Sequence, residues 1–157
     1  MTIRFPSLAA MTMALLALAP TPRAAAVIAL EATTQSNLAF GQIVATSSAG
    51  AVTVWPNGSR TASGGVVLGN AFGVSAASFA VTGEPNSSYG ITLPSPCTLS
   101  AAGASMTADV FTSNPSGSGS LGPSGTQTVT MGATLRVGSR QVSAGYSGSY
   151  AVTLAYP

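Results

Sequence analysis

The stretch Gly145-Tyr-Ser-Gly-Ser-Tyr-Ala-Val-Thr-Leu-Ala-Tyr-Pro157 carries the clearest structural pattern of the chain. From Tyr150 onward small residues alternate with large ones, and the large side chains fall on every second position: Tyr150, Val152, Leu154 and Tyr156. A β-strand points successive side chains to opposite faces, so this period of two gives the segment one bulky face and one light face. We therefore predict a long terminal strand whose bulky face closes the core.

Other stretches predict strands from the same period of two. Gln127–Val137 alternates between apolar and polar residues, which puts Arg136 on the solvent-exposed face of the predicted strand. Ala77–Thr82 and Tyr89–Leu93 flank the turn-forming Gly83–Asn86, so we predict that they pair as a hairpin. Shorter extended pieces are predicted at 27–34, 37–41, 51–55, 65–68 and 105–112. Turn signals separate these pieces and no segment has a helical period, which predicts an all-β sandwich or barrel of about seven to nine short antiparallel strands.

The first 26 residues have the layout of a secretory signal peptide. Arg4 precedes an apolar run from Leu8 to Ala19, and the small residues Ala24-Ala25-Ala26 form a cleavage site. The apolar run is shorter than the ~20 residues that a membrane-spanning helix needs. We therefore predict a signal peptide at 1–26 and one mature domain at 27–157, without a membrane span.

The charge of the chain changes when the predicted signal peptide is removed. Arg4 and Arg23 leave with it, so three arginines face three carboxylates and the mature net charge is zero: Arg60, Arg136 and Arg140 against Glu31, Glu84 and Asp109. Nucleic acids and anionic lipid surfaces are bound through clusters of basic residues, and the mature chain has none. We therefore predict no nucleic-acid partner.

The residue types that most enzymes use are missing. The chain has no histidine and all five of its basic residues are arginine, which excludes Ser-His-Asp, Cys-His and Ser-Lys arrangements. Its three carboxylates are scattered, and the stock of zinc ligands is thin. The one G-x-G-x-x-G match, Gly117–Gly122, lies between Pro115 and Pro123 with no helix after it, so we interpret it as a surface loop. We predict a non-enzymatic protein without cofactor or metal.

Two observations leave alternatives open. Cys97 is the only cysteine, so it is either a small buried residue near the start of a strand or the donor of an intermolecular disulfide. Trp55 and the tail tyrosines Tyr146, Tyr150 and Tyr156 either form an aromatic platform for sugars or fill the core and its ends.

Several short motifs resemble bacterial pilin-like secreted domains, notably chaperone–usher fimbrial subunits and spore-coat-U-like proteins. The tail pattern runs from Gly145-Tyr through the alternating strand to the near-terminal Tyr156, and Leu38-Ala-Phe40-Gly41 resembles an early element of the same group. Val81–Asn86 and Gly119-x-Leu121-Gly122 resemble a branch described as a domain of unknown function. The resemblance implies an immunoglobulin-like β-sandwich that lacks one strand. The chain departs from the group in lacking its common disulfide, because Cys97 is alone. It also implies strand donation by a neighbouring subunit, a periplasmic chaperone and an outer-membrane usher.

These expectations define the candidate function and site. We expect a secreted, fimbria-like structural or adhesive subunit that passes through the periplasm to the cell surface and self-assembles or joins related subunits. The alternative is a monomeric secreted or cell-surface domain that binds glycans or proteins. The candidate assembly residues are Gly145, Tyr150, Val152, Leu154 and Tyr156 of the tail, with Ile28 and Leu30 as anchors of a donor segment at 27–33. Whether 27–34 donates a strand or forms the first strand of its own domain stays open.

Overall fold

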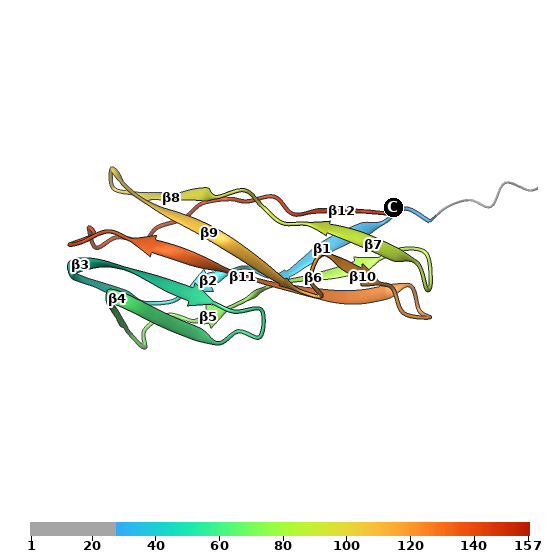
Figure 1. Ribbon diagram of the computed structural model, residues 1–157, viewed down its shortest axis with the longest axis horizontal. Coiled ribbons are helices and arrows are strands. Elements are labelled where there is room, and N and C mark those ends of the chain that lie inside the picture. Colours follow the sequence, from blue (N-terminus) through green and yellow to red (C-terminus); the bar gives the residue numbers. More distant parts are fainter. Residues whose placement is uncertain (1–27) are drawn as a thin grey trace, which may run out of the picture.

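The protein folds as an elongated, sandwich-like all-β structure (Figure 1). The structure is a computed structural model, and it describes residues 28–157, so the predicted signal peptide lies outside the described residues. No helix in the described range is long and apolar enough to cross a membrane. All twelve elements of the described residues are strands, so the sequence-based prediction of an all-β fold is confirmed.

The largest sheet has seven strands and is organised around its central strand, β11. One edge of β11 pairs with β6 and then with β3, and its other edge pairs with β9. β1 extends the sheet beyond β6, β4 extends it beyond β3, and β8 pairs with β9. All these pairs are antiparallel. The strands are β1 (Glu31–Ser36), β3 (Ile43–Val54), β4 (Arg60–Leu68), β6 (Ala77–Thr82), β8 (Cys97–Ala101), β9 (Ala104–Asn114) and β11 (Thr126–Val137).

Two smaller antiparallel sheets complete the fold. One has the order β10-β7-β12 and the other pairs β2 with β5. Their strands are β2 (Ala39–Phe40), β5 (Val74–Ser75), β7 (Ser88–Thr92), β10 (Ser118–Ser120) and β12 (Thr153–Ala155). The described residues thus form twelve strands instead of the expected seven to nine, because four of these elements are only two or three residues long.

β11 confirms the prediction made from its alternating residues. Arg136 points to solvent and forms an ion pair with Asp109 at 3.0 Å. The apolar positions are at most 3% exposed and line the core: Val129, Met131, Ala133, Leu135 and Val137. β11 therefore buries one whole face, as its period of two requires.

The predicted hairpin of Ala77–Thr82 with Tyr89–Leu93 is wrong. β6 pairs with β1 and β11, whereas β7 pairs with β10 and β12. Val81 of β6 and Tyr89 of β7 belong to the same buried cluster, so the two strands face each other across the core. The turn between them carries the chain from one sheet to another, because packing of their apolar faces replaces edge-to-edge pairing.

The predicted long terminal strand is also wrong in its length, although its two faces are as expected. Only Thr153–Ala155 pairs with β7, and before it Ser147 makes a single bridge to Ser100. The bulky tail residues are half-buried and the small residues between them are exposed. A period of two reports which side of an extended chain is covered, and it does so without a continuous ladder of hydrogen bonds. We call residues 138–157 the tail.

Candidate functional site

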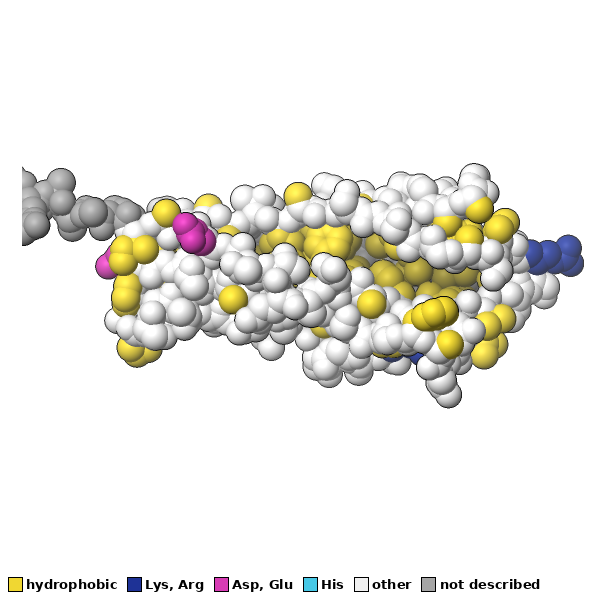
Figure 2. Space-filling view, turned by 180° about the vertical axis from the view of Figure 1, so that it is seen from behind, with side chains coloured by type: hydrophobic (Ala, Val, Ile, Leu, Met, Phe, Trp, Pro, Cys, Tyr) yellow, Lys and Arg dark blue, Asp and Glu magenta, His cyan; other side chains and the backbone are white. Residues whose placement is uncertain are grey.

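An open apolar groove runs along the molecule between β1 and the tail. It consists of three cavities of about 160, 440 and 640 Å³. Thr34, Phe79 and Tyr150 line both the small and the middle cavity, whereas the middle and large cavities share four residues: Leu38, Phe40, Leu99 and Tyr146. Shared linings make the cavities one continuous groove. Figure 2 shows a hollow along the long axis with hydrophobic side chains on its floor.

The two walls of the narrow part are edges of different sheets. β1 is the outer strand of the seven-stranded sheet, and Ala32 and Thr34 line the groove from it. β12 is the outer strand of the three-stranded sheet, and the tail contributes Val152 and Leu154 opposite them. An outer strand presents backbone N–H and C=O groups that no neighbouring strand satisfies. The groove therefore lies between two edges that are each able to pair with an added strand.

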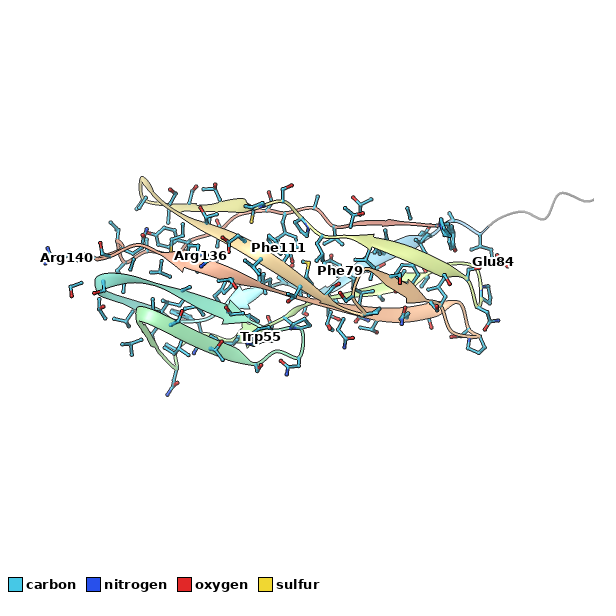
Figure 3. All side chains as sticks on the ribbon, in the orientation of Figure 1. Trp55, Phe79, Glu84, Phe111, Arg136 and Arg140 are labelled. Atoms are coloured by element: carbon cyan, nitrogen blue, oxygen red, sulfur yellow. The ribbon has the colours of Figure 1, made fainter. Side chains whose placement is uncertain are left out.

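Aromatic side chains form the floor in the middle of the groove. Figure 3 shows Phe79 and Phe111 directed into the space between the layers. Phe111 packs against Tyr150 with ring centroids 5.6 Å apart. Burial raises the pKa of Tyr150, which keeps its phenol neutral. The floor is therefore apolar, and the Phe111 and Tyr150 rings pack against each other in it.

The groove lining is uncharged. None of the three cavities is lined by Asp, Glu, Lys or Arg. The polar side chains around it are hydroxyls and a few amides, such as Asn37 and Gln141. Within residues 28–157 no three Asp, Glu, Cys or His side chains are grouped so that they could hold a metal ion. This surface suits a neutral and largely apolar occupant.

The wide end of the groove carries exposed apolar side chains. Phe72 is 81% exposed and adopts a positive φ of 69°, a conformation that is costly for a bulky residue. Val44 and Val142 lie at the same end and are about half exposed. The backbone N–H of Ala71 donates to the Gln42 side chain at 3.2 Å, and the N–H of Gln42 donates to the Ala71 carbonyl at 3.1 Å. These two hydrogen bonds fix Ala71, and the ring of the next residue, Phe72, is exposed to solvent at the wide end of the groove.

Arg60 fastens this end of the groove to the main sheet. Its guanidinium donates to three backbone carbonyls, those of Phe40 at 2.7 Å, Gln42 at 3.0 Å and Gly69 at 2.8 Å. The planar, forked guanidinium satisfies several acceptors at once, which an ammonium group does less well. Arg60 thereby joins β2 to the loop that carries Phe72.

The tail residues predicted from the sequence do converge on the groove. Tyr150, Val152 and Leu154 line it, and Gly145 lies at its wide end. Tyr156 lies beyond it and packs on the smaller buried cluster, where its hydroxyl accepts a hydrogen bond from the Glu84 N–H at 2.6 Å. Four of the five predicted tail residues therefore belong to the groove, and the fifth holds the tail to the β6–β7 turn.

The predicted donor segment is placed differently. Glu31–Ser36 forms β1 and pairs with β6 of the same chain. Leu30 is half-buried against the smaller cluster, whereas Ile28 is 52% exposed. Of the two interpretations of residues 27–34, the first strand of the chain's own domain is the one observed for Glu31–Thr34.

The remaining candidates do not form sites of their own. Cys97 begins β8, is half-buried and lines the middle cavity; burial raises the pKa of its thiol. Gly117–Gly122 contains β10, which pairs with β7, so no helix follows the glycine motif. Trp55 lines none of the three cavities, and its indole N–H donates to the Thr61 hydroxyl at 3.3 Å. Trp55 and the tail tyrosines therefore do not share one platform.

Sequence reasoning missed most of the floor of the groove. Its members come from separate strands and loops, and their only local signal is an apolar residue in a short extended segment: Phe72, Phe79, Leu99, Met106 and Phe111. Leu38 and Phe40 did carry a signal, because both lie on one face of a predicted strand and in the Leu-x-Phe-Gly motif.

Comparison with protein families identifies the family to which the chain belongs. The family described as Domain of unknown function (DUF4402) matches residues 30–156. The chain belongs to the DUF4402 family. The DUF4402 match includes β1, the tail through Tyr156 and everything between them, so both walls and the floor of the groove are parts of the family domain. No curated protein and no solved structure matches the chain.

Proposed function

We propose that this DUF4402 protein is a non-enzymatic, secreted structural or adhesive subunit, fimbria-like, that assembles by accepting a β-strand from a neighbouring subunit. The observation that carries the proposal is the uncharged apolar groove between two unpaired sheet edges. Adding a strand to an exposed edge satisfies backbone groups, while alternate side chains enter the groove.

The dimensions of the groove favour a strand over a small ligand. The tail lines the groove from Gln141 to Leu154. About ten residues of extended chain, such as Gly145–Leu154, span roughly 33 Å. A strand of that length directs about five side chains inward, and each large apolar one contributes about 1.5–3 kcal/mol when fully buried. That gain is enough to hold subunits together despite the cost of ordering the added segment.

The expected cellular context follows from the resemblance to pilin-like domains. It implies an immunoglobulin-like domain at 27–157, export by the signal peptide at 1–26, and a periplasmic chaperone that protects the groove before assembly at an outer-membrane usher. A bare edge beside an apolar floor recruits other chains without discrimination, so a protecting partner has a physical role.

A pair of arginine substitutions tests the proposal. Val142 and Val67 are similarly exposed, at 53% and 56%, but only Val142 lines the groove. Val142→Arg places a charged side chain at the wide end of the groove and is expected to abolish assembly, whereas Val67→Arg is expected to leave it intact. Electron microscopy and SDS-resistant ladders of secreted material measure assembly. If the two variants assemble equally, or the wild type is a stable monomer, strand acceptance is wrong.

A further inference from the structure

We infer that the occupant of the groove is a strand of about ten residues from another polypeptide, whose inward side chains are uncharged and increase in bulk toward the end of the groove at Phe72. This inference rests on the proposed function and adds to it the source and the chemistry of the added strand. Three observations carry it.

The first observation concerns the chain's own first strand. The segment Glu31–Ser36 forms β1 and pairs with β6 from Glu31 opposite Thr82 to Ser36 opposite Ser78, with a shift in register between Thr34 and Ser36. It also forms a wall of the groove, through Ala32 and Thr34. A segment that forms the wall of this groove cannot at the same time fill the groove of a second copy. The occupant must therefore come from a different stretch of polypeptide.

The second observation is the absence of charge in the lining. A charged side chain that points inward would lose its hydration without gaining a partner, because no Asp, Glu, Lys or Arg lines the three cavities. The inward positions of the occupant are therefore apolar, and its charges lie outside the groove.

The third observation is the gradient of width. The cavity beside Tyr150–Leu154 has about 160 Å³, the one beside Tyr146–Tyr150 about 440 Å³, and the one beside Gln141–Tyr146 about 640 Å³. The tail lines them through three, five and six residues in turn, and the volume increases about fourfold from the narrow end to the wide end. Both unfilled space and overpacking lower the stability of a protein core. The best occupant therefore has small side chains at the narrow end and large ones at the wide end.

Exposed residues at the wide end support the same conclusion. Phe72 is held in a left-handed backbone conformation with most of its ring in solvent, beside Val44 and Val142. An aromatic side chain entering the wide end would cover this ring and pack against it. The most strained and most exposed aromatic residue thus lies where the largest side chain of the occupant is expected.

Synthetic peptides test the gradient. Three peptides each have a ten-residue segment with threonine at the five outward positions and the same five inward residues in different orders, and a lysine is added at each end of the segment. Two are graded in opposite directions (Phe, Phe, Val, Ala, Ala and its mirror), and the third is symmetric (Phe, Ala, Val, Ala, Phe). The purified protein is refolded from urea with each peptide, and circular dichroism gives the folded fraction. Alkylation of Cys97 by N-ethylmaleimide, measured by intact mass, reports occupancy because Cys97 lines the middle of the groove.

One of the two graded peptides is expected to protect Cys97 at a concentration about tenfold lower than the symmetric peptide, corresponding to about 1.4 kcal/mol. Equal protection by the symmetric peptide would overturn the gradient while leaving strand acceptance intact. If no peptide protects Cys97 or improves refolding, both the gradient and the proposed function are wrong. Phe72→Gly keeps the positive φ without strain, so it should fold and should reduce the preference for the graded peptide at least threefold. An unchanged preference would show that Phe72 does not contribute to recognition of the graded peptide.

Discussion

The buried ring of Tyr89 explains the Gly119-x-Leu121-Gly122 motif. Tyr89 is the largest side chain that is fully buried among the described residues, and its hydroxyl donates to the Gln127 side chain. Gly119 lies against its ring, where a Cβ would stand 2.5 Å from the ring carbon. Leu121, two residues on, is 2% exposed in the same cluster. The Gly119-x-Leu121-Gly122 motif therefore forms part of the buried surface that packs around Tyr89.

The burial of Tyr89 predicts a dependence of stability on alkaline pH. Burial raises its pKa above the ordinary value of 10.0, so the folded state holds the phenol proton more tightly than the unfolded state. This contribution is complete below pH 10 and is lost as the pH rises through the pKa of the folded protein. The free energy of unfolding should therefore fall more steeply above pH 10 in the wild type than in Tyr89→Phe. Urea unfolding between about pH 8 and 11 measures this difference, and parallel profiles would contradict it.

Gly41 of the Leu38-Ala-Phe40-Gly41 motif predicts a second residue-scale effect. It has a φ of +69°, and an added Cβ would lie 2.7 Å from both Arg60 Nη1 and Val74 Cγ2. Gly58 has a φ of +81° but nothing within 4 Å of an added Cβ. Gly58→Ala should cost about 1–2 kcal/mol for the backbone conformation alone. Gly41→Ala should cost at least about 1–3 kcal/mol more, because the Arg60 contacts must shift. Equal losses in chemical denaturation would mean that the crowding is relieved without cost.

At the scale of elements, the tail shows how an extended segment is stabilised without regular pairing. Three residues pair with β7, Ser147 bridges to Ser100, and the bulky side chains of Tyr150, Val152, Leu154 and Tyr156 pack on the two buried clusters. The hydroxyl of Tyr156 fastens its end to the turn at Gly83–Glu84, where a Cβ on Gly83 would collide with that hydroxyl. The Val81–Asn86 motif and the near-terminal aromatic residue are thus parts of one contact.

Neighbouring tail substitutions test this account. Val152→Asp puts a carboxylate among both buried clusters, which costs several kcal/mol out of a total stability of roughly 5–15 kcal/mol. Thr153→Asp changes the exposed face and should cost less than about 1 kcal/mol. The yield of folded protein and its unfolding midpoint measure both effects. Similar damage from the two substitutions would show that the two faces of the tail are equally covered.

At the scale of the whole molecule, the open groove runs along one side of the sandwich-like fold. The chain ends three residues after Leu154, which lines the narrow cavity, and Figure 1 shows the C-terminus beside β1 at that end of the molecule. A strand attached there could return through the groove toward Phe72. A strand fused to Pro157 would therefore meet the narrow cavity first and the cavity at Phe72 last.

A fused strand predicts a large gain in stability. A Gly/Ser linker and a ten-residue strand with small inward residues first and phenylalanine last, joined to Pro157, should fill the groove from its narrow end. Two large side chains buried at about 1.5–3 kcal/mol each should raise the free energy of unfolding by roughly 3–6 kcal/mol before the cost of closing the loop. The matched control carries Asp at the inward positions and should gain nothing. Urea denaturation compares the two, and an equal stability of both fusions would show that the strand does not enter the groove.

Local sequence patterns predict which faces of the strands are buried. The periods of two in Gln127–Val137 and in the tail correctly predicted the buried side of each segment, because alternation is a local property of extended backbone. The same patterns predicted an all-β protein, and the tail motif identified four residues that line the groove. These inferences needed no knowledge of which strands are neighbours.

Which strands pair with one another depends on tertiary packing and is not encoded in these local patterns. β6 and β7 are adjacent in the sequence, yet they lie in different sheets because their apolar faces pack on each other through Val81 and Tyr89. The floor of the groove combines Phe79, Leu99 and Phe111 from three separate strands, and β1 forms its wall instead of leaving the domain as a donor. Such contacts arise from burial summed over distant segments, so no local pattern encodes them, and the open groove exists only because two sheet edges end beside a shared apolar core.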